Sequence, residues 1–409
     1  MNGLALLRQP AVGPLLGAQL FTALGDNALL IAAIALLEDG GAPAWMSPAL
    51  RICLYLSYVA LAPFAGALAD RLPKGRLVAL VNLAKLGGCV LLAAGLHPLL
   101  AFGAIGLVGV LHGPAKYGIL SELVPSADLV RANAWLEVAT VSAILGGAAL
   151  GAGLLRAPVW QPWMPVLHSA ARQASLLLGA LFIAAALFAR AIPATACACA
   201  REHATLARFG RQLAALWRDP QGQVALGVTA LFWAVAAVLQ FLVIRWAEAV
   251  LELSLGEAAL LQCCLAVGVV AGSLGVARLV DAGAALRVLP GGVALGLAVM
   301  LVSQVTRLPA ACAALCAAGV VAGAVMVPMN ALLQERGLAL MRPGASIAVQ
   351  SFSENLASLV FLGVYGLLLT AAVPLRAIIV GFGLLITALM LLLQRRAPLP
   401  LSTESDACP

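Results

Sequence analysis

The sequence predicts an all-α polytopic membrane protein built as two halves of six helices. Of its 409 residues 63% are hydrophobic and only 10% are charged, whereas soluble domains have about a quarter charged residues. Apolar runs of about twenty residues recur from end to end, and an α-helix of that length crosses a hydrocarbon core of about 30 Å. A basic polar interval at the midpoint of the chain divides these runs into two equal sets. Segments of about ten residues with alternating polarity are not found, so a transmembrane β-barrel is excluded.

Length and hydropathy predict about twelve membrane spans. In chain order they cover residues 11–37, 47–69, 77–96, 99–121, 130–155, 173–190, 221–247, 257–279, 288–306, 310–333, 345–371 and 374–393. The first span keeps Asp26 and Asn27 in its interior and has no small-residue cleavage site, so we expect a retained helix and not a signal peptide.

The charged residues predict how the spans are oriented. If both termini lie on one side, the loops on that side hold most of the 24 Lys and Arg residues, and the positive-inside rule then places both termini in the cytoplasm. The net charge of +7 is thus explained by topology, and no nucleic-acid partner is expected. The expected domains are a six-helix half (1–190), a cytoplasmic linker (191–220), a second six-helix half (221–396) and a cytoplasmic tail (397–409), a duplication typical of transporters.

The nine cysteines predict neither a disulfide framework nor a metal site. Cys197 and Cys199 lie two positions apart with His203 nearby, and ordinary thiols in a reducing compartment are the favoured interpretation of this group. We therefore expect no metal and no cofactor.

A short motif follows the second span. It consists of a glycine, an acidic residue and a basic cluster: Gly66, Asp70, Arg71, Lys74 and Arg76. Gly66 permits close helix approach, Asp70 can pair with a basic side chain or a helix N-terminus, and the cations anchor the loop on the cytoplasmic side.

The eighth span ends with a weaker copy of this motif, which contains Gly272, Arg278 and Asp281. The first copy resembles the signature of the major facilitator superfamily. The resemblance implies a fold in which helices one, four, seven and ten line a central cavity, with the two motifs holding the cytoplasmic side closed in the outward-open state.

Polar residues inside the spans are candidates for a site, because an ionisable group at a helix centre costs about 2.5–3.5 kcal/mol even on lenient scales. In the first span Gln19, Thr22 and Asp26 share one helical face, which Asn27 extends. In the fourth span His112 and Lys116 are four residues apart. With both helices lining one cavity, Asp26 and Lys116 are expected to face the same water-filled space and to stabilise each other's charge.

The segment around Lys116 also predicts a distorted helix. Pro114 donates no N–H and frees a carbonyl one turn earlier, while Gly113 and Gly118 loosen the helix. A kinked helix beside a cation can offer both a charge and free carbonyl groups to a ligand. The alternative is a kink used only for packing.

The remaining polar candidates lie on the fifth, tenth and eleventh spans. They are Glu137, Asn330, Gln334, Gln350 and Glu354. Amides and hydroxyls at such positions serve as interhelical hydrogen-bond partners about as often as they bind ligands. The two carboxylates are better candidates for function, because helix association does not require charge.

Several ordered segments resemble the bacterial lysophospholipid transporter family. They are "GDNALL", "GPAKYGIL", "LVRANAWLEVATVSAILGG", "VPMNALLQERG" and "SIAVQSFSEN", and the likeness runs from about residue 14 to about residue 396. The resemblance implies movement of lysophospholipids, chiefly lysophosphatidylethanolamine, from the outer to the inner leaflet of the bacterial inner membrane. It also implies a separate acyl carrier protein-dependent acyltransferase as partner, because no histidine here begins an HxxxxD acyltransferase motif.

A zwitterionic head group needs a cation for its phosphate and a carboxylate for its ammonium. Lys116 is expected to take the phosphate, with Tyr117 beside it, and Asp26 the ammonium. Family members carry an arginine in the seventh span where this chain has Gln240. Arg245, five residues on, either reaches back to the site or anchors the outer interface.

Three other functions were weighed against lysophospholipid transport. A cation-coupled exporter of amphiphilic molecules would use Asp26 or Glu354 as a proton carrier. A membrane enzyme would need a nucleophile or a metal set, and the four histidines supply no HExxH motif. A purely structural scaffold would not explain charges within the spans. We expect a monomeric transporter that is not an enzyme.

Overall fold

The computed structural model describes residue 6 and residues 9–43, 46–156, 169–195, 205–253, 255–280 and 282–398. Within these residues all regular elements are helices. Their bounds are α2 (Val12–Asp39), α3 (Met46–Arg71), α4 (Lys74–Ala93), α5 (Pro98–Gly109), α6 (His112–Leu123), η1 (Ser126–Asp128), α7 (Leu129–Arg156), α8 (Ala170–Arg190), α9 (Leu206–Arg218), α10 (Pro220–Val250), α11 (Leu255–Leu279), η3 (Ala282–Val288), α12 (Leu289–Val302), α13 (Leu308–Leu340), α14 (Pro343–Thr370) and α15 (Leu375–Arg396).

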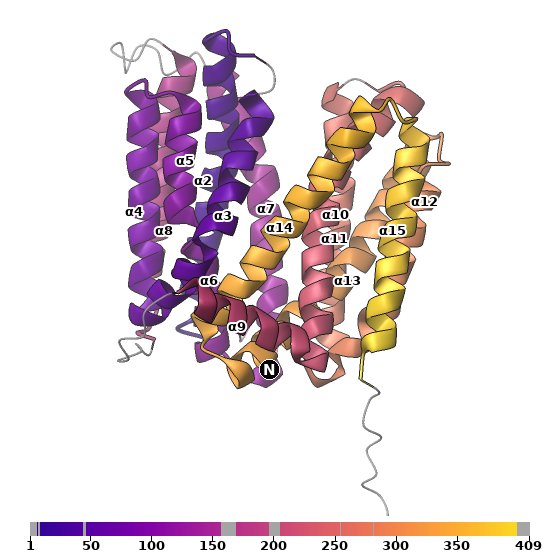
Figure 1. The fold of residues 1–409 in the computed structure, drawn as a ribbon. Helices are drawn as coiled ribbons and strands as arrows, with labels where there is room; N and C mark the ends of the chain where they lie inside the picture. Colours follow the sequence, from indigo (N-terminus) through magenta and orange to yellow (C-terminus); the bar gives the residue numbers. More distant parts are fainter. Residues whose placement is uncertain are drawn as a thin grey trace, which may run out of the picture.

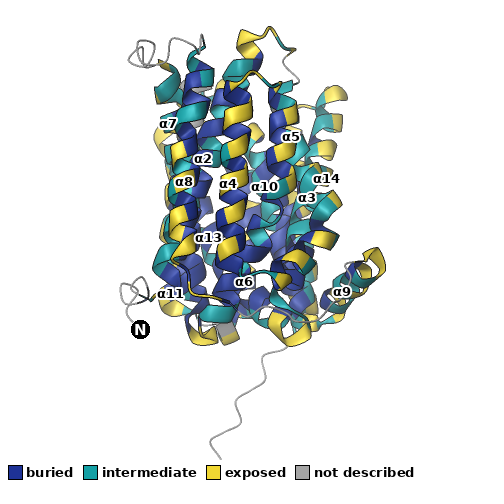
Figure 2. Cartoon of the chain, turned by 90° about the vertical axis from the view of Figure 1, so that its left-hand side faces the viewer, coloured by how far each residue is buried: buried dark blue, intermediate teal, exposed yellow. Residues whose placement is uncertain are grey.

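Twelve of these segments are long and apolar enough to cross a membrane, with α5 and α6 forming one span and η3 and α12 another. The predicted all-α polytopic class is thereby confirmed. Large apolar side chains lie on the outside of the bundle, where a soluble protein would place polar ones. In Figure 2 exposed residues follow the outward faces of α4 and α8; the most exposed large apolar side chains are Leu279, Leu367, Leu206, Leu301, Leu100 and Leu187.

The spans gather into two bundles, α2–α8 and α10–α15 (Figure 1). We call these bundles the N-terminal half and the C-terminal half. They lie close together at the end of the molecule where the N-terminus lies, and they diverge toward the opposite end. These ends are called the closed end and the open end below.

Helix α9 lies across the closed end between the two halves (Figure 1). Thr205 caps it by accepting the Arg208 N–H at 3.2 Å. Phe209 is buried and meets the Phe352 ring of α14 edge to face. The amphipathic helix therefore packs its apolar face on the C-terminal half. The predicted boundaries of the linker, the halves and the tail stay predictions.

Asp219 connects α9 to α10 and ties both to α13. Its carboxylate accepts the Gly222 N–H at 2.7 Å, which caps α10, and it receives two hydrogen bonds from the Arg336 guanidinium, the shorter at 2.5 Å. The hydrogen bonds from Arg336 hold the pKa of the Asp219 carboxyl below its usual range, against a smaller opposing effect of burial.

The fourth span is broken at Val110 and Leu111, between α5 and α6. This is one turn before Pro114, where the missing N–H predicts the distortion. The Leu111 N–H donates to the Val108 carbonyl at 3.2 Å, a tighter turn than the α-helix makes. Lys116 thus sits on a short helix of its own, which ends at Leu123 near the closed end.

Candidate substrate site

Asp26 pairs with Lys85 of α4 and not, as the sequence predicted, with Lys116. The Lys85 ammonium lies 2.6 Å and 2.8 Å from the two Asp26 carboxylate oxygens. Lys85 is almost fully buried, while the Asp26 side chain is 39% exposed. The expectation of an Asp26–Lys116 pair is therefore wrong. The polar residues of the first span do share one face, but the basic side chain that reaches Asp26 comes from the third span.

The other polar residues of this face join a network within the N-terminal half. Thr22 donates to Asn82 of α4 at 2.8 Å. Gln19 donates to Thr140 of α7 at 2.9 Å, and its side-chain oxygen lies 3.1 Å from the His112 Nε2. These contacts link α2 to three neighbouring helices. Buried polar groups rigidify a core only when each has a hydrogen-bond partner.

Asn27 does not extend this network. Its side-chain amide donates to the Ala23 carbonyl of its own helix at 2.8 Å. Gly147 of α7 packs closely against the Asn27 Cβ, which places this side chain beside α7.

Lys116 is buried without an ion pair among the described residues. Its ammonium lies 4.4 Å from the centre of the Tyr117 ring, a cation–π contact. Its helix α6 packs against α14, which carries Glu354, and meets α7, which carries Glu137. Lys116 is therefore placed where the N-terminal half meets the C-terminal half.

The carbonyl group freed near the break in the fourth span already has a partner. Tyr58 of α3 donates its hydroxyl hydrogen to the Gly109 carbonyl at 3.0 Å. Pro114 itself leaves the Val110 carbonyl without its usual N–H partner, so the prediction that this segment offers carbonyl groups to a ligand stays a prediction. The hydrogen bond at Gly109 joins α3 to the fourth span at the break.

The polar residues of the tenth and eleventh spans separate into two groups. Gln350 donates to both Asn330 and Glu354 at 2.8 Å, so these three side chains form one chain of hydrogen bonds. Gln334 and Asn133 of α7 instead donate to each other, at 2.9 Å and 3.1 Å. Gln334 is buried and fully engaged by this pair across the two halves, and its geometry fits helix association rather than the predicted ligand binding.

Gln240 receives a hydrogen bond from Arg51 of α3 at 2.9 Å, which is a second polar contact between the halves. Arg245 is exposed and lines a surface depression with Glu248 and Leu375. Its exposed position fits the expectation that Arg245 anchors the end of the span. Its side chain does not reach back toward Gln240.

The closed end is held by the motif after the second span. Asp70 accepts the backbone N–H groups of Gly344 at 2.8 Å and Ala345 at 3.3 Å, which are the first turn of α14. A carboxylate at a helix N-terminus is stabilised by the dipole and the unpaired N–H groups. A Cβ on Gly66 would lie 2.7 Å from the Gly344 carbonyl oxygen, so only glycine permits this approach of α3 to α14.

The cations of the motif have different environments. Lys74 is buried and pairs with Glu122 of α6 at 2.5 Å and with Asp70 at 3.9 Å. It therefore joins α4 to α6 inside the protein and does not anchor the loop at a membrane surface as predicted. Arg71 and Arg76 are exposed, and their role as anchors of the loop on the cytoplasmic side stays a prediction.

The copy of the motif in the C-terminal half packs differently. A Cβ on Gly272 would overlap the Val320 carbonyl of α13, so this glycine joins two helices of the same half. Arg278 is exposed, and Asp281 lies outside the described residues. A second junction between the halves lies where α7 packs against α11 and α13. There Val276 and Ala331 of the C-terminal half join the apolar core of the N-terminal half.

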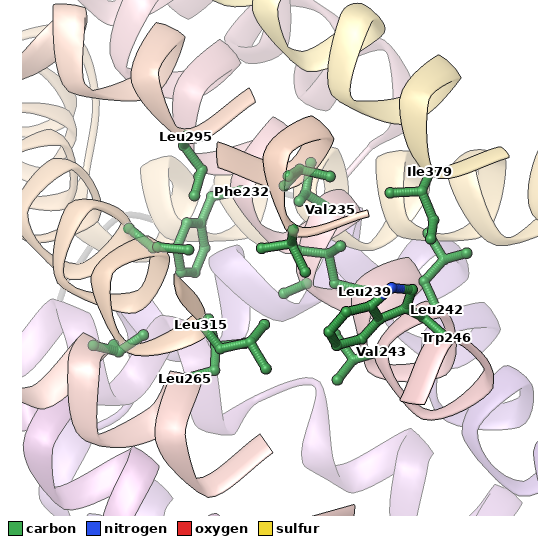
Figure 3. Close-up of a pocket in the computed structure, with 16 residues that line it drawn as sticks. Phe232, Val235, Leu239, Leu242, Val243, Trp246, Leu265, Leu295, Leu315 and Ile379 are labelled. Atoms are coloured by element: carbon green, nitrogen blue, oxygen red, sulfur yellow. The ribbon is translucent and has the colours of Figure 1, made fainter. Parts of the chain in front are cut away.

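The C-terminal half contains an apolar cavity of about 120 Å³ between α10, α11, α12, α13 and α15. Its lining is aliphatic and aromatic throughout, with Phe232, Leu239 and Trp246 of α10 along its length and Leu265, Leu295, Leu315 and Ile379 around it (Figure 3). This cavity was not predicted, because its lining residues cannot be distinguished in the sequence from other apolar positions of a span.

Two polar residues that matter here were not singled out from the sequence. Lys85 forms the ion pair of the N-terminal half. A charge within a span is costly, and this argument, used to single out Lys116, applies equally to Lys85. Arg51 lies close to the start of α3, so its sequence position indicated a cation at the membrane interface. Cys197, Cys199 and His203 lie outside the described residues, and no metal-binding cluster is found in the part of the chain that is described.

Solved structures of low sequence identity share this fold. A bacterial homologue of the iron transporter ferroportin in the outward-facing state superposes with a TM-score of 0.70 at 17% identity, over 94% of this chain and 99% of its own. The transporter FucP in the outward conformation gives 0.72 at 15% identity, over 95% and 98%. The human organic anion transporter MFSD10 gives 0.72 at 17% identity, over 95% and 99%. The chain thus has the fold of a major facilitator superfamily transporter.

Curated relatives narrow this class. The lysophospholipid transporters LplT of Yersinia pestis (strain Pestoides F) and Yersinia pseudotuberculosis (serotype O:3, strain YPIII) are each 36% identical over 362 residues, which cover 88% of this chain and 87% of theirs. No protein-family model matches the chain. The chain belongs to the lysophospholipid transporter family, and it is a multi-pass membrane transporter and not an enzyme.

Proposed function

We propose that this protein moves lysophospholipids, chiefly lysophosphatidylethanolamine (2-acyl-glycerophosphoethanolamine), from the outer to the inner leaflet of the bacterial inner membrane. The closed end then faces the cytoplasm, as do both termini. A separate acyl carrier protein-dependent acyltransferase re-acylates the delivered lipid. The transporter works as a monomer by facilitated alternating access, in which the two halves rock about a central site.

The observation that carries this proposal is the environment of Lys116. A buried ammonium without an ion pair among the described residues lies on α6, which packs against α14, the helix of Glu354, and meets α7, the helix of Glu137. A phosphate can approach the cation, and the ammonium of ethanolamine can approach the carboxylates. Because Asp26 is engaged by Lys85, we assign the head-group ammonium to Glu137 and Glu354 and give Asp26 the role of fixing α2 against α4.

The proposed mechanism begins with the state described here. The Asp70 contacts to the first turn of α14 and the Asn133–Gln334 pair hold the halves together at the closed end. A lipid head group that binds Lys116 and the two carboxylates contacts both halves at once. Bound lipid thereby favours closure of the open end, and release of the Asp70 contacts then exposes the site to the cytoplasm.

Uptake of labelled lysophosphatidylethanolamine into proteoliposomes tests the proposal. Lys116→Met keeps an unbranched side chain without the charge, and a hydrogen bond to a charged group contributes about 1.5–3 kcal/mol, so uptake should fall about 10- to 150-fold. Arg307→Met removes an exposed cation outside the site and should leave uptake unchanged. Absence of uptake by the unmodified protein above empty vesicles would refute the function. Uptake that collapses when a proton gradient is dissipated would favour a cation-coupled exporter.

A further inference from the structure

A cationic groove lies at the closed end, between α9 and the connection from α13 to α14. It has a volume of about 490 Å³ and is lined by three arginines, Arg208, Arg211 and Arg342, together with Gln212, Leu340 and Met341. Among the described residues that line it, none is acidic. A guanidinium presents its N–H groups as a planar fork that matches the oxygens of a phosphate. The groove is therefore complementary to a phosphate group in both charge and hydrogen-bonding geometry.

Two of these arginines have donors to spare. Arg211 is exposed on α9, and Arg342 is the residue directly before the first turn of α14. Within the described ranges of the chain, neither forms an ion pair. A smaller hollow that adjoins the groove contains Asp70, but the Asp70 carboxylate already accepts two backbone N–H groups. The positive charge of the groove is thus not cancelled by a carboxylate in contact with either arginine.

Helix α9 also presents apolar side chains to its surroundings. Phe209 and Leu216 are buried against the protein, whereas Leu206 is 69% and Trp217 is 39% exposed. Leu206 and Trp217 are eleven residues apart, which is about three turns, so they lie on the same side of the helix. Figure 2 shows α9 projecting at one side of the closed end, beyond α3 and α14. An amphipathic helix with basic residues and exposed Leu and Trp side chains is typical of the boundary between lipid head groups and acyl chains.

The apolar rim of the groove decides which kind of phosphate it suits. Leu340 lines the groove and is 41% exposed, and Leu338 on the same turn of α13 is exposed as well. A free phosphate ion or a soluble acidic protein gains nothing from apolar side chains beside the arginines. In a phospholipid, by contrast, the phosphate is followed within a few bonds by acyl chains. The combination of arginines with exposed leucines therefore favours a lipid as the occupant.

We propose that this groove binds the head group of an anionic phospholipid, such as phosphatidylglycerol, from the leaflet at the closed end. Arg211 and Arg342 bind the phosphodiester, and Leu340 contacts the first methylenes of the chains. The groove lies on the surface, apart from the buried Lys116, so the lipid is a bound component of the membrane and not the transported molecule. The proposed function enters only in calling this leaflet the inner one.

The bound lipid joins α9 to α14. The two helices already touch where the Phe209 ring meets the Phe352 ring edge to face. A phosphodiester held by Arg211 and Arg342 adds a second, polar link between the same helices. A surface helix with few buried side chains opens locally at low cost in free energy. The anionic lipid should therefore slow backbone hydrogen exchange within α9.

Competition between lipids on the full-length protein tests the proposal. Native mass spectrometry in an equimolar mixture of phosphatidylglycerol and phosphatidylcholine with the same chains should show preferential retention of phosphatidylglycerol. One arginine near an anionic lipid changes its affinity about fivefold, so Arg211→Gln and Arg342→Gln should each lower the affinity for phosphatidylglycerol by about this factor. Arg395→Gln is the matched control, because Arg395 is an exposed cation at the end of α15. It should leave the preference unchanged.

Hydrogen exchange in lipid nanodiscs provides a second measurement, which does not depend on how the variants fold. Exchange within α9 of the unmodified protein should be slower in phosphatidylglycerol than in phosphatidylcholine. Equal exchange in the two lipids, equal retention of the two lipids, or the same loss of affinity in Arg395→Gln overturns the proposal.

Two competitors distinguish the lipid from other anions. Displacement of phosphatidylglycerol by inorganic phosphate or by poly-glutamate at the same concentration overturns the proposal, since the groove would then bind a free ion or an acidic protein. None of these measurements uses lipid uptake, so a failure here is distinguishable from failure of the proposed function.

Discussion

The N-terminal and C-terminal halves share one architecture but place their polar groups differently. In the N-terminal half an ion pair, Asp26–Lys85, lies in the middle of the spans. In the C-terminal half the pair Arg336–Asp219 lies at the closed end, and the spans hold an apolar cavity and the hydrogen-bonded Gln350 and Glu354 of α14. A buried charge pair contributes little net stability but is costly to break. The pair within the spans of the N-terminal half should therefore be more costly to break than the partly exposed pair at the closed end.

The largest effect should come from breaking the charged centre of the N-terminal half. Lys85→Met leaves the Asp26 carboxylate half-buried without its partner, which should destabilise the protein by about 2–4 kcal/mol. Thermal unfolding in detergent, together with lipid uptake, measures this loss. Adding Asp26→Asn to Lys85→Met should recover part of the stability because the unpaired charge is gone. A double variant less stable than either single variant would show that the pair is not coupled.

Disturbing the junction of the halves should have the next largest effect. In Gly66→Ala the new methyl group meets the Gly344 carbonyl oxygen and the Ala345 Cα, both backbone atoms that cannot rotate away. Overpacking of this kind costs about 1–3 kcal/mol, and here the cost falls only on the state with a closed end. Distances between spin labels on α3 and α14 should therefore shift toward a separated population.

Gly87→Ala is the matched control for this substitution, because a Cβ at Gly87 meets no atom within 4 Å. It should leave the distance distribution unchanged. An unchanged distribution for Gly66→Ala as well would show that α3 and α14 can separate slightly without opening the closed end.

The sequence predicted the spans but not their partners, and the reason is physical. Span length and hydropathy are properties of one segment, so all twelve spans were found from the apolar runs. The partner of Asp26 depends on how each helix is rotated and packed, which no single segment encodes. Lys116 was chosen because the first and fourth helices were expected to line one cavity, whereas Lys85 of the third span is the residue that pairs with Asp26.

Positions that act through the backbone were easier to predict than positions that act through side chains. Gly66 and Asp70 were assigned correct local roles, because close approach and capping of a helix N-terminus follow from residue type. Pro114 predicted the break in the fourth span, but the hydrogen bond from Tyr58 to the freed Gly109 carbonyl required knowledge of α3. The contact of Arg51 with Gln240 joins residues of different halves and had no local signal.

The amide pair across the halves should have an intermediate effect. Asn133→Leu leaves the buried Gln334 amide without its reciprocal partner, at a cost of about 1–2 kcal/mol. Asn133→Leu with Gln334→Met removes both polar groups and should cost less than the sum of the single changes, with a coupling of about 1 kcal/mol. Thermal unfolding of the four proteins of this cycle gives the coupling. Strict additivity would mean that the pair does not join the halves energetically.

The smallest effect should come from the ion pair of the C-terminal half. Asp219→Asn keeps the cap of α10, since asparagine is also a good N-cap, but weakens the pair with the partly exposed Arg336, which is worth about 0–1 kcal/mol. Because Arg336 lowers the pKa of the Asp219 carboxyl, the folded state holds this proton less tightly than the unfolded chain. The stabilisation is therefore fully present above the usual carboxyl pKa of about 3.9 and is lost as the pH falls further.

The melting temperature of Asp219→Asn should thus lie below that of the unmodified protein by a constant small interval from neutral pH to about pH 5. The interval should vanish as the pH approaches the lowered pKa of Asp219. An effect as large as that of Lys85→Met would contradict the contrast between the halves, because it would place an equally costly charged centre at the end of the C-terminal half. An interval that widens on acidification would reverse the sign expected from Arg336.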